Sequence, residues 1–274
     1  MTDKNIAFIG AGNMATSIIG GLIEHGWPKD RIFASCRTEE SASKRADELG
    51  IQAFTNNLEA AEKADIVVLA VKPQMMRAVL TELAPALQRQ KPFIISVAAG
   101  IRLESLDAWS GGGLPIVRSM PNTPSLLQCG ATGLYANALV NDELKAITSG
   151  IFEPVGILHW LEREEQIDTI TAISGSGPAY FFLFMEAMAE AGVKLGLDHE
   201  TAERFSLQTA LGAANMAIQS DVDAAELRRR VTSPGGTTEQ ALKTFRQEGF
   251  EEVIYKAVKA AKNRGAELAE QLAD

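Results

Sequence analysis

Near its start the chain reads Ile6-Ala7-Phe8-Ile9-Gly10-Ala11-Gly12-Asn13-Met14-Ala15, and this pattern sets the architecture of its first half. Four apolar residues in a row predict a buried strand, and the apolar residues that recur afterwards at helical spacing predict a helix. Between them, Gly10 would permit a tight turn, Gly12 would leave room for a ligand beside the backbone, and Ala15 would let helix and strand pack closely. The first amides of such a helix are free and lie at the positive end of its dipole. The pattern therefore predicts a site for the pyrophosphate of a dinucleotide.

Short apolar runs bounded by turn residues alternate with helical patterns as far as residue 160. This alternation is typical of a mostly parallel sheet with helices on both faces. The predicted strands are Ile6–Ile9, Ile32–Ser35, Ile66–Val71, Phe93–Val97, Ile116–Ser119, Ala131–Ala136 and Ile157–Trp160, and the helices between the later ones are Glu39–Leu49, Met75–Leu87, Leu103–Trp109 and Glu143–Ile151. We predict an α/β fold whose N-terminal, Rossmann-like dinucleotide-binding domain spans residues 1–163.

The strand pattern stops near residue 164, and only helical patterns follow. The predicted helices are Pro178–Val193, His199–Gln219, Ala224–Val231, Thr237–Gln247 and Phe250–Leu272. A helical unit of this size with such apolar helices would bury them against a second subunit. We therefore predict that residues 164–274 form an all-α domain for substrate binding and dimerisation.

Composition narrows the class of protein. The 274 residues are 46% hydrophobic and 22% charged, and the formal net charge of −9 argues against a nucleic-acid binder. The two cysteines, Cys36 and Cys129, suggest a reducing compartment, and the histidines have no metal-ligand spacing, so we expect no metal. There is no signal-peptide pattern and no apolar run long enough for a membrane span, so we expect a cytoplasmic protein without membrane contact.

The end of the second predicted strand bears on the choice between NAD and NADP. A free ribose 2′-hydroxyl is usually met there by an acidic residue, but this strand ends in Ser35-Cys36-Arg37-Thr38. Arg37 and the neighbouring hydroxyls could hold a 2′-phosphate, which favours NADPH and leaves NADH possible. The alternative is that Glu39 or Glu40 serves the ribose. Asn57 is either a helix N-cap or a ribose contact, and the sequence favours the cap.

Three later segments end strands at the edge where open α/β sheets bind ligands: Val71-Lys72-Pro73-Gln74, Ser96–Gly100 and Arg118–Pro124. Each could be an ordinary turn, but together they suggest a single crevice. In the second half, Val231–Gln240 leads through one proline and two glycines into a helix. Its start is either a capping box of Thr237 with Gln240 or an anion site on the amides of Gly236, Thr237 and Thr238.

These segments resemble the pyrroline-5-carboxylate reductase family over nearly the whole chain. The resemblance rests on Phe8–Ala15, Ala70–Gln74, Ser96–Gly100, Met120–Pro124, Ser174–Tyr180, Gly192–Leu197 and, above all, Val231–Leu242. It implies NADPH-dependent reduction of 1-pyrroline-5-carboxylate to L-proline, the last step of proline biosynthesis, by hydride transfer to the cyclic imine carbon. It also implies a helical domain that interlocks with a partner chain, giving a homodimer or a larger ring such as a decamer.

The resemblance also implies residue roles. The backbone around Gly236, Thr237 and Thr238 would hold the substrate carboxylate, and the Thr238 hydroxyl would bond to the ring nitrogen. Ser233 would add a contact, and Asp221 would be a possible proton relay. The implied cofactor-binding residues are Gly10, Gly12, Asn13, Met14, Ser35, Arg37, Asn57, Val71, Lys72, Pro73, Ala98 and Ala99, with Asn122 near the nicotinamide.

Two other functions compete with this one. Another NADP-dependent imine or β-hydroxyacid reductase would share the two-domain plan, but hydroxyacid enzymes generally need a lysine base on the first long helix of the second domain. The predicted helix Pro178–Val193 offers Glu186 and Glu190, and no lysine occurs before Lys194. An NADPH-binding redox sensor would bind the cofactor without turnover.

Overall fold

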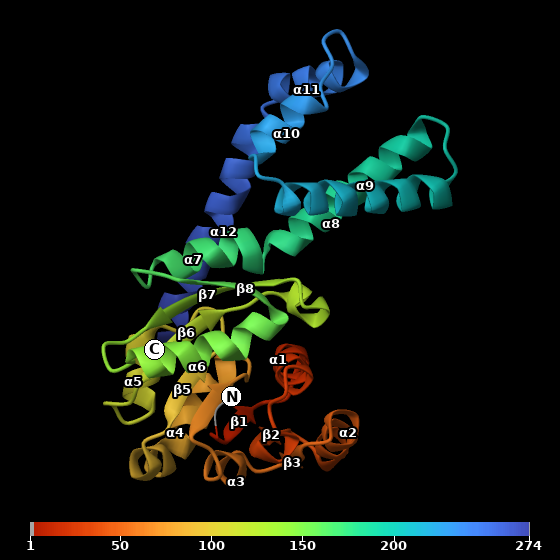
Figure 1. Ribbon diagram of the computed structural model, residues 1–274. Helices are drawn as coiled ribbons and strands as arrows, with labels where there is room; N and C mark the ends of the chain where they lie inside the picture. The colour runs from red at the N-terminus through yellow and green to blue at the C-terminus, as the bar shows by residue number, and fades with distance from the viewer. Residues whose placement is uncertain (1–2, 274) are drawn as a thin grey trace. The chain divides into compact units, whose positions relative to one another are not determined.

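The computed structural model describes residues 3–273, and the chain forms two compact units (Figure 1). One unit contains residues 3–176 together with 261–273, and the other contains residues 177–260. The last helix, α12 (Phe250–Ala273), contributes to both units. This division does not follow the sequence boundary at residues 163 and 164, so that boundary stays a prediction.

The first unit is built on one eight-stranded sheet with the order β3-β2-β1-β4-β5-β6-β7-β8. Neighbouring strands run parallel except β6 and β7, which are antiparallel. The strands are β1 (Ile6–Ile9), β2 (Ile32–Ser35), β3 (Gln52–Phe54), β4 (Ile66–Leu69), β5 (Phe93–Ser96), β6 (Ile116–Met120), β7 (Gly130–Ala136) and β8 (Gly156–Trp160). Because β1 lies between β2 and β4, the strand order reverses direction at β1, and ligands of such sheets bind outside the carboxyl ends at that point.

Helices cover both faces of this sheet (Figure 1). They are α1 (Asn13–Glu24), α2 (Glu39–Leu49), α3 (Asn57–Ala61), α4 (Pro73–Gln90), α5 (Leu103–Trp109), α6 (Asp142–Phe152) and α7 (Gln166–Ile170), with a π-helical turn, η4 (Thr171–Gly175), after α7. Short 3-10 turns occur at η1 (Lys29–Arg31), η2 (Thr123–Leu127) and η3 (Glu153–Val155). The predicted α/β fold class is confirmed. The pattern missed β3, α3, α7 and η4, which are all five residues or shorter.

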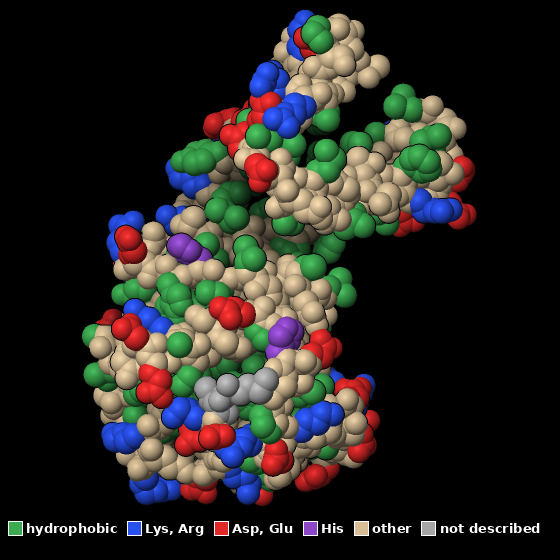
Figure 2. All heavy atoms as spheres, viewed as in Figure 1, with side chains coloured by type: hydrophobic (Ala, Val, Ile, Leu, Met, Phe, Trp, Pro, Cys, Tyr) green, Lys and Arg blue, Asp and Glu red, His purple; other side chains and the backbone are tan. Residues whose placement is uncertain are grey.

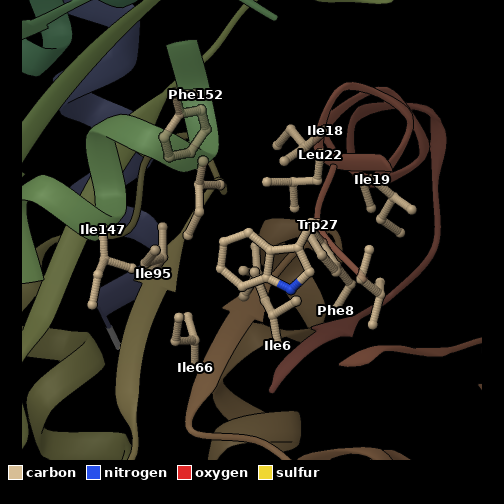
Figure 3. Close-up of a cluster of buried hydrophobic side chains, with 14 of the residues drawn as sticks. Ile6, Phe8, Ile18, Ile19, Leu22, Trp27, Ile66, Ile95, Ile147 and Phe152 are labelled. Carbon is tan, nitrogen blue, oxygen red and sulfur yellow. The ribbon is translucent and has the colours of Figure 1, made fainter. Parts of the chain in front are cut away.

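Two hydrophobic cores explain why the strand sequences are apolar without interruption. Ile6 and Phe8 of β1 belong to one core with Trp27 and Phe152 (Figure 3). The alternate residues of the same strand, Ala7 and Ile9, belong to the other. Since successive side chains point to opposite faces, a strand covered on both sides must be apolar at every position. Each large side chain buried in this way contributes about 1.5–3 kcal/mol.

A buried charge cluster joins the segment after β8 to the sheet. Arg118 of β6 is only 2% exposed, and its guanidinium contacts Glu164 at 3.0 Å and Asp168 at 3.5 Å. Glu164 also accepts a hydrogen bond from the Leu103 amide at 2.8 Å. Breaking a buried ion pair by removing one partner typically costs 3–5 kcal/mol, so this cluster holds the start of α7 firmly. The sequence pattern gives no sign of it, because Arg118 lies 46 and 50 residues before its two acidic partners.

The second unit is helical. It contains α8 (Gly177–Lys194), α9 (His199–Gln219), α10 (Ala224–Arg230), α11 (Thr237–Gln247) and the first part of α12. Helices α8 and α9 pack closely, and a Cβ added at Gly192 would lie 3.1 Å from the Ala202 Cβ. Many apolar side chains nevertheless lie open on this unit (Figure 2). Among them are Phe181 (67% exposed), Phe205 (71%) and Ile218 (82%). Such a surface is typical of helices that bury their apolar faces against another chain.

None of the helices within residues 3–273 is both long enough and apolar enough to cross a membrane.

Candidate cofactor and substrate sites

The glycine turn after β1 has the geometry that the sequence predicts. Gly10 has φ +95°, and a Cβ there would lie 3.0 Å from the carbonyl carbon and oxygen of Ala70. Any other residue would be strained and would clash with backbone at this point. Gly12 is the N-cap of α1 with extended backbone (φ −75°, ψ −176°), and no side chain of the described residues caps the helix. A Cβ at Gly12 would meet no atom of residues 3–273 within 4 Å. The first amides of α1 are therefore uncapped beside open space.

A chain of hydrogen bonds holds this turn against β2 and α3. The Gly10 amide donates to the Ser35 hydroxyl at 3.1 Å, and that hydroxyl donates to Asn57 Oδ1 at 2.7 Å. Ser35 is 1% exposed, so its hydroxyl serves the protein's own backbone and Asn57. Ser35, which the resemblance placed among the cofactor residues, thus fixes the position of Gly10.

The helix cap predicted at Asn57 is wrong by one residue. Asn56 is the N-cap of α3, and its side chain accepts a hydrogen bond from the Leu58 amide at 2.8 Å. Asn57 is the first residue of the helix, so its side chain is free to reach Ser35. Two adjacent asparagines are equally good caps by residue type, and only the path of the chain after β3 distinguishes them.

The tip of β2 bears on the cofactor's ribose. Arg37 and Thr38 are exposed there, and Thr38 caps α2 in a capping box with Ser41. Glu39, the acidic alternative for a free 2′-hydroxyl, accepts a hydrogen bond from the Thr55 hydroxyl at 3.1 Å. Burial raises the pKa of the Cys36 thiol, while the nearby Arg45 guanidinium and Ser41 act in the opposite direction. Glu40, the other acidic alternative, is exposed as well. Arg37 is therefore the group at this tip that can pair with a phosphate, and it stands beside two carboxylates.

The other predicted cofactor residues lie at the carboxyl ends of β4 and β5. Val71 follows β4, and its Cγ1 would lie 3.0 Å from a Cβ at Gly10. Lys72 is exposed and extended (φ −60°, ψ 144°) as the N-cap of α4, with Pro73 as the first helical residue. After β5, Ala98 is buried and Ala99 is half-buried. Small side chains there leave the backbone accessible to a ring system.

Asn122 lies beyond the carboxyl end of β6 and is 8% exposed. Its Nδ2 donates to the Ser174 carbonyl at 3.1 Å, and its Oδ1 accepts from the Ala131 amide at 2.8 Å. Both ends of the side chain therefore contact backbone, and Asn122 ties η4 to the start of β7. It thereby supports the loop beside the predicted nicotinamide position.

The predicted substrate segment in the second unit forms a turn that leads into α11. The Gly236 amide donates to the Ser233 carbonyl at 3.0 Å, with Pro234 and Gly235 (φ +70°) as the two central residues. Proline followed by a glycine with positive φ is the signature of a type II turn. The Gly235 amide donates to the Glu239 carboxylate at 2.8 Å. Both hydrogen bonds join residues of the segment Ser233–Glu239, so the turn is stabilised by its own neighbouring residues.

This turn corrects one sequence prediction and refines another. The capping box of Thr237 with Gln240 is wrong, because Gly236 is the N-cap (φ −83°, ψ 174°) and Thr237 is the first helical residue. No side chain of residues 3–273 caps α11. The Gly236 amide is bonded to Ser233, so the free amides begin at Thr237 and Thr238. Thr237 and Ser233 are exposed, and Thr238 is half-buried.

Two further features belong to the same unit. Asp221, the proposed proton relay, is exposed in the bend between α9 and α10. A cavity of about 1020 Å³ lies between α10 and α11, lined by charged residues such as Glu226, Arg229 and Glu239. Glu239 belongs to both the cavity lining and the segment Ser233–Glu239, whereas Ser233, Thr237 and Thr238 do not line the cavity, so it borders the predicted substrate position.

Comparison with known proteins places this geometry in a family. Residues 164–268 match the model for the dimerisation domain of pyrroline-5-carboxylate reductase, and residues 5–100 match that for coenzyme F420-dependent NADP oxidoreductases. The chain is 56% identical to pyrroline-5-carboxylate reductase of Pseudomonas aeruginosa, with 99% of each chain covered, and 42% identical to that of Vibrio alginolyticus, with 98% of each covered.

The chain belongs to the pyrroline-5-carboxylate reductase family. Among solved structures, the pyrroline-5-carboxylate reductase of Coxiella burnetii superposes with a TM-score of 0.93 at 44% identity, over 97% of this chain and 99% of that one. The Plasmodium falciparum enzyme, solved with NADP bound, gives a TM-score of 0.86 at 31% identity, over 98% and 99% of the two chains.

Membership in the pyrroline-5-carboxylate reductase family confirms the predicted NADP-dependent oxidoreductase and its reaction at the last step of proline biosynthesis. The match to the dimerisation model confirms that the helical part serves homo-oligomer formation. The sequence does not indicate three contacts found in the structure. They are the ion pairs of Arg118, the bond from Arg45 to the Ala11 carbonyl, and the bond from the Gly235 amide to Glu239. Arg118 and Glu239 lie inside segments that the sequence singles out, but their partners cannot be read from residue type.

Proposed function

We propose that this chain binds NADPH at the Gly10–Met14 turn and holds the carboxylate of 1-pyrroline-5-carboxylate at the start of α11. The observation that carries the proposal is that α1 and α11 both begin at a glycine in extended backbone, and that no side chain within the described part of the chain caps either helix. Uncapped helix starts bind anions, and this reaction needs two: a pyrophosphate and a carboxylate.

The residues of the first unit fit a dinucleotide. The open space at Gly12 admits a pyrophosphate beside the amides of Asn13 and Met14. Arg37 at the tip of β2 would pair with the 2′-phosphate, and Val71, Lys72, Pro73, Ala98 and Ala99 line the strand ends along which the rest of the cofactor would lie. When bound, the nicotinamide supplies a hydride for the imine carbon.

The residues of the second unit fit the substrate. The amides of Thr237 and Thr238 would bind its carboxylate, with the Gly236 backbone and the Ser233 hydroxyl beside them. The Thr238 hydroxyl would bond to the ring nitrogen and keep the protonated imine oriented, because a protonated imine is the better electrophile. Asp221 would relay the proton that this nitrogen needs.

One assay tests this reading against its alternatives. Purified protein, NADPH and 1-pyrroline-5-carboxylate should give proline and oxidised cofactor. Turnover of a β-hydroxyacid but not of the imine would favour the hydroxyacid reductase, although no lysine occurs in α8 before Lys194. Tight NADPH binding without turnover of either substrate would favour a sensor.

The cofactor preference has its own test. Arg37→Ala should lower the ratio of kcat/KM for NADPH over NADH by about tenfold, since one charge-assisted hydrogen bond is removed from the 2′-phosphate complex only. An unaltered ratio would rule out a phosphate role for Arg37.

We further propose a homo-oligomer, either a dimer or a decamer assembled from dimers, and a cytoplasmic location. The open apolar side chains of α8 and α9 support an assembly larger than one chain, and sedimentation equilibrium would distinguish a dimer from a decamer. The free thiols of Cys36 and Cys129 support a reducing compartment, which fractionation of the source cells would test.

A further inference from the structure

Arg45 contacts the glycine turn from α2, a helix that carries none of the proposed cofactor or substrate residues. It lies on α2, its side chain is 21% exposed, and its Nε donates to the Ala11 carbonyl at 3.2 Å. Ala11 is the central residue of the Gly10–Gly12 turn. The turn is therefore bonded on both sides: β2 holds the Gly10 amide through Ser35, and α2 holds the Ala11 carbonyl through Arg45.

The planarity of the peptide bond gives the second contact a consequence for the ligand. The Ala11 carbonyl and the Gly12 amide belong to one trans peptide, so they point in opposite directions from a rigid plane. Fixing the carbonyl on Arg45 therefore fixes the direction of the Gly12 N–H. That N–H opens the series of free amides at the start of α1, beside the space where a Cβ at Gly12 would meet no described atom.

We propose that Arg45 is a positioning residue for the cofactor, which orients the Gly12 amide toward the pyrophosphate by binding the Ala11 carbonyl behind it. This proposal rests on the proposed cofactor site. It differs from the role given to Arg37, because the pyrophosphate is common to NADPH and NADH whereas the 2′-phosphate is not.

The charges around Arg45 support a positioning role over direct phosphate binding. Its NH1 pairs with Glu48 on the same helix, and Lys44 lies 3.7 Å from that carboxylate. Two of the guanidinium nitrogens of Arg45 are thus already bonded, to Glu48 and to the Ala11 carbonyl, whereas Arg37 at the tip of β2 is exposed. The guanidinium also lies near Cys36, which directly follows β2, and its charge acts to lower the pKa of that thiol.

The test compares four variants of the full-length protein. Arg45→Ala removes the bond to Ala11, Arg45→Lys keeps one donor, Glu48→Gln removes only the ion pair, and Arg37→Ala is the 2′-phosphate control. Dissociation constants for NADPH and NADH are measured by nicotinamide fluorescence, kcat is measured at saturating cofactor, and thermal melting of the free protein monitors folding.

We expect Arg45→Ala to raise the dissociation constants of NADPH and NADH by the same factor, about tenfold. The kcat at saturating cofactor should stay within about twofold of the parent value. Arg45→Lys should recover part of the affinity, and Glu48→Gln should leave both constants unchanged. Arg37→Ala should weaken the binding of NADPH and leave the binding of NADH unchanged.

Three results would overturn the proposal. A loss confined to NADPH would make Arg45 a direct 2′-phosphate ligand, unchanged constants for both cofactors would leave it without a role, and a lowered melting point with an equal loss in Glu48→Gln would make it only a helix-stabilising residue. Should Arg45→Ala not fold, the comparison of Arg45→Lys with Glu48→Gln decides by the same criteria. A parent protein that binds neither cofactor would refute the proposed function itself.

Discussion

Helices α1 and α11 begin alike but are supported differently. Each has a glycine N-cap in extended backbone and no side chain of residues 3–273 on the cap. The turn before α1 is held by Ser35 and Arg45, which come from other elements of the sheet unit. The turn before α11 is held by Ser233 and Glu239, all within seven consecutive residues. One helix start depends on the tertiary fold, and the other is a local structure.

The difference suits the two ligands proposed for them. A dinucleotide is long and contacts several strand ends, so its phosphate site must keep a fixed position within a rigid sheet. A small carboxylate needs only a few amides in the right orientation, which a type II turn followed by a helix can supply by itself. Substitutions at the two turns should therefore have different consequences, because those at the first can disturb the whole unit.

Gly10→Ala should have the largest effect. The new Cβ would require a positive φ and would lie 3.0 Å from the Ala70 backbone, so we expect the free energy of unfolding to fall by about 2–4 kcal/mol. Denaturant unfolding of the free protein measures this. Gly12→Ala is the matched control: its backbone is already extended and its Cβ meets no described atom, so stability should change little while cofactor affinity falls. Equal losses of stability in the two variants would contradict the distinction.

Thr238→Ala should come next, with an effect on catalysis and not on folding. Removing the hydroxyl that orients the ring nitrogen should lower kcat/KM for 1-pyrroline-5-carboxylate by about tenfold, which corresponds to about 1.4 kcal/mol. Because α11 begins in a local turn, the unfolding midpoint should be unchanged. Steady-state kinetics and a thermal melt check both statements. A normal kcat/KM would remove Thr238 from the mechanism.

The same difference explains how much the sequence could predict. The strands of the sheet were predictable because burial on both faces imposes an apolar run, and α9 and α11 were predicted with the bounds that the structure shows. The substrate segment could be located because its turn is encoded by neighbouring residues, Pro234 and Gly235. The features that the sequence did not predict correctly depend on contacts between distant residues or on a shift of a helix cap by one residue. The hydrogen bonds at the glycine turn involve Ser35, Arg45 and Asn57, which come together only in the folded sheet. Hydrophobic periodicity does not predict such contacts.

The short elements were not predicted for a related reason. Strand β3 has three residues, of which Gln52 is exposed, so it shows neither an apolar run nor a clear alternation. It pairs with β2 at the edge of the sheet, and that pairing is what makes it a strand. The capping box at Thr237 failed because Gly236 can take the cap position equally well, and the preceding type II turn delivers Gly236 to it.

Glu239→Gln should give the smallest effect and the sharpest test of the local turn. The amide oxygen of glutamine can still accept from the Gly235 N–H, so the turn is kept, but a negative charge beside the proposed carboxylate site is lost. We expect KM for the substrate to fall by about twofold at low ionic strength, and this advantage to vanish in about 1 M salt, because exposed charges are screened.

Glu239→Ala separates the charge from the hydrogen bond. It also removes the charge, but it frees the Gly235 amide and loosens the turn, so KM should rise although the site is less negative. If both variants lower KM equally, the hydrogen bond to Gly235 does not order the site, and the start of α11 is held by the Pro234–Gly235 turn alone. If neither changes KM at low salt, the substrate carboxylate does not bind at this helix start, and the likeness between α1 and α11 has no functional meaning.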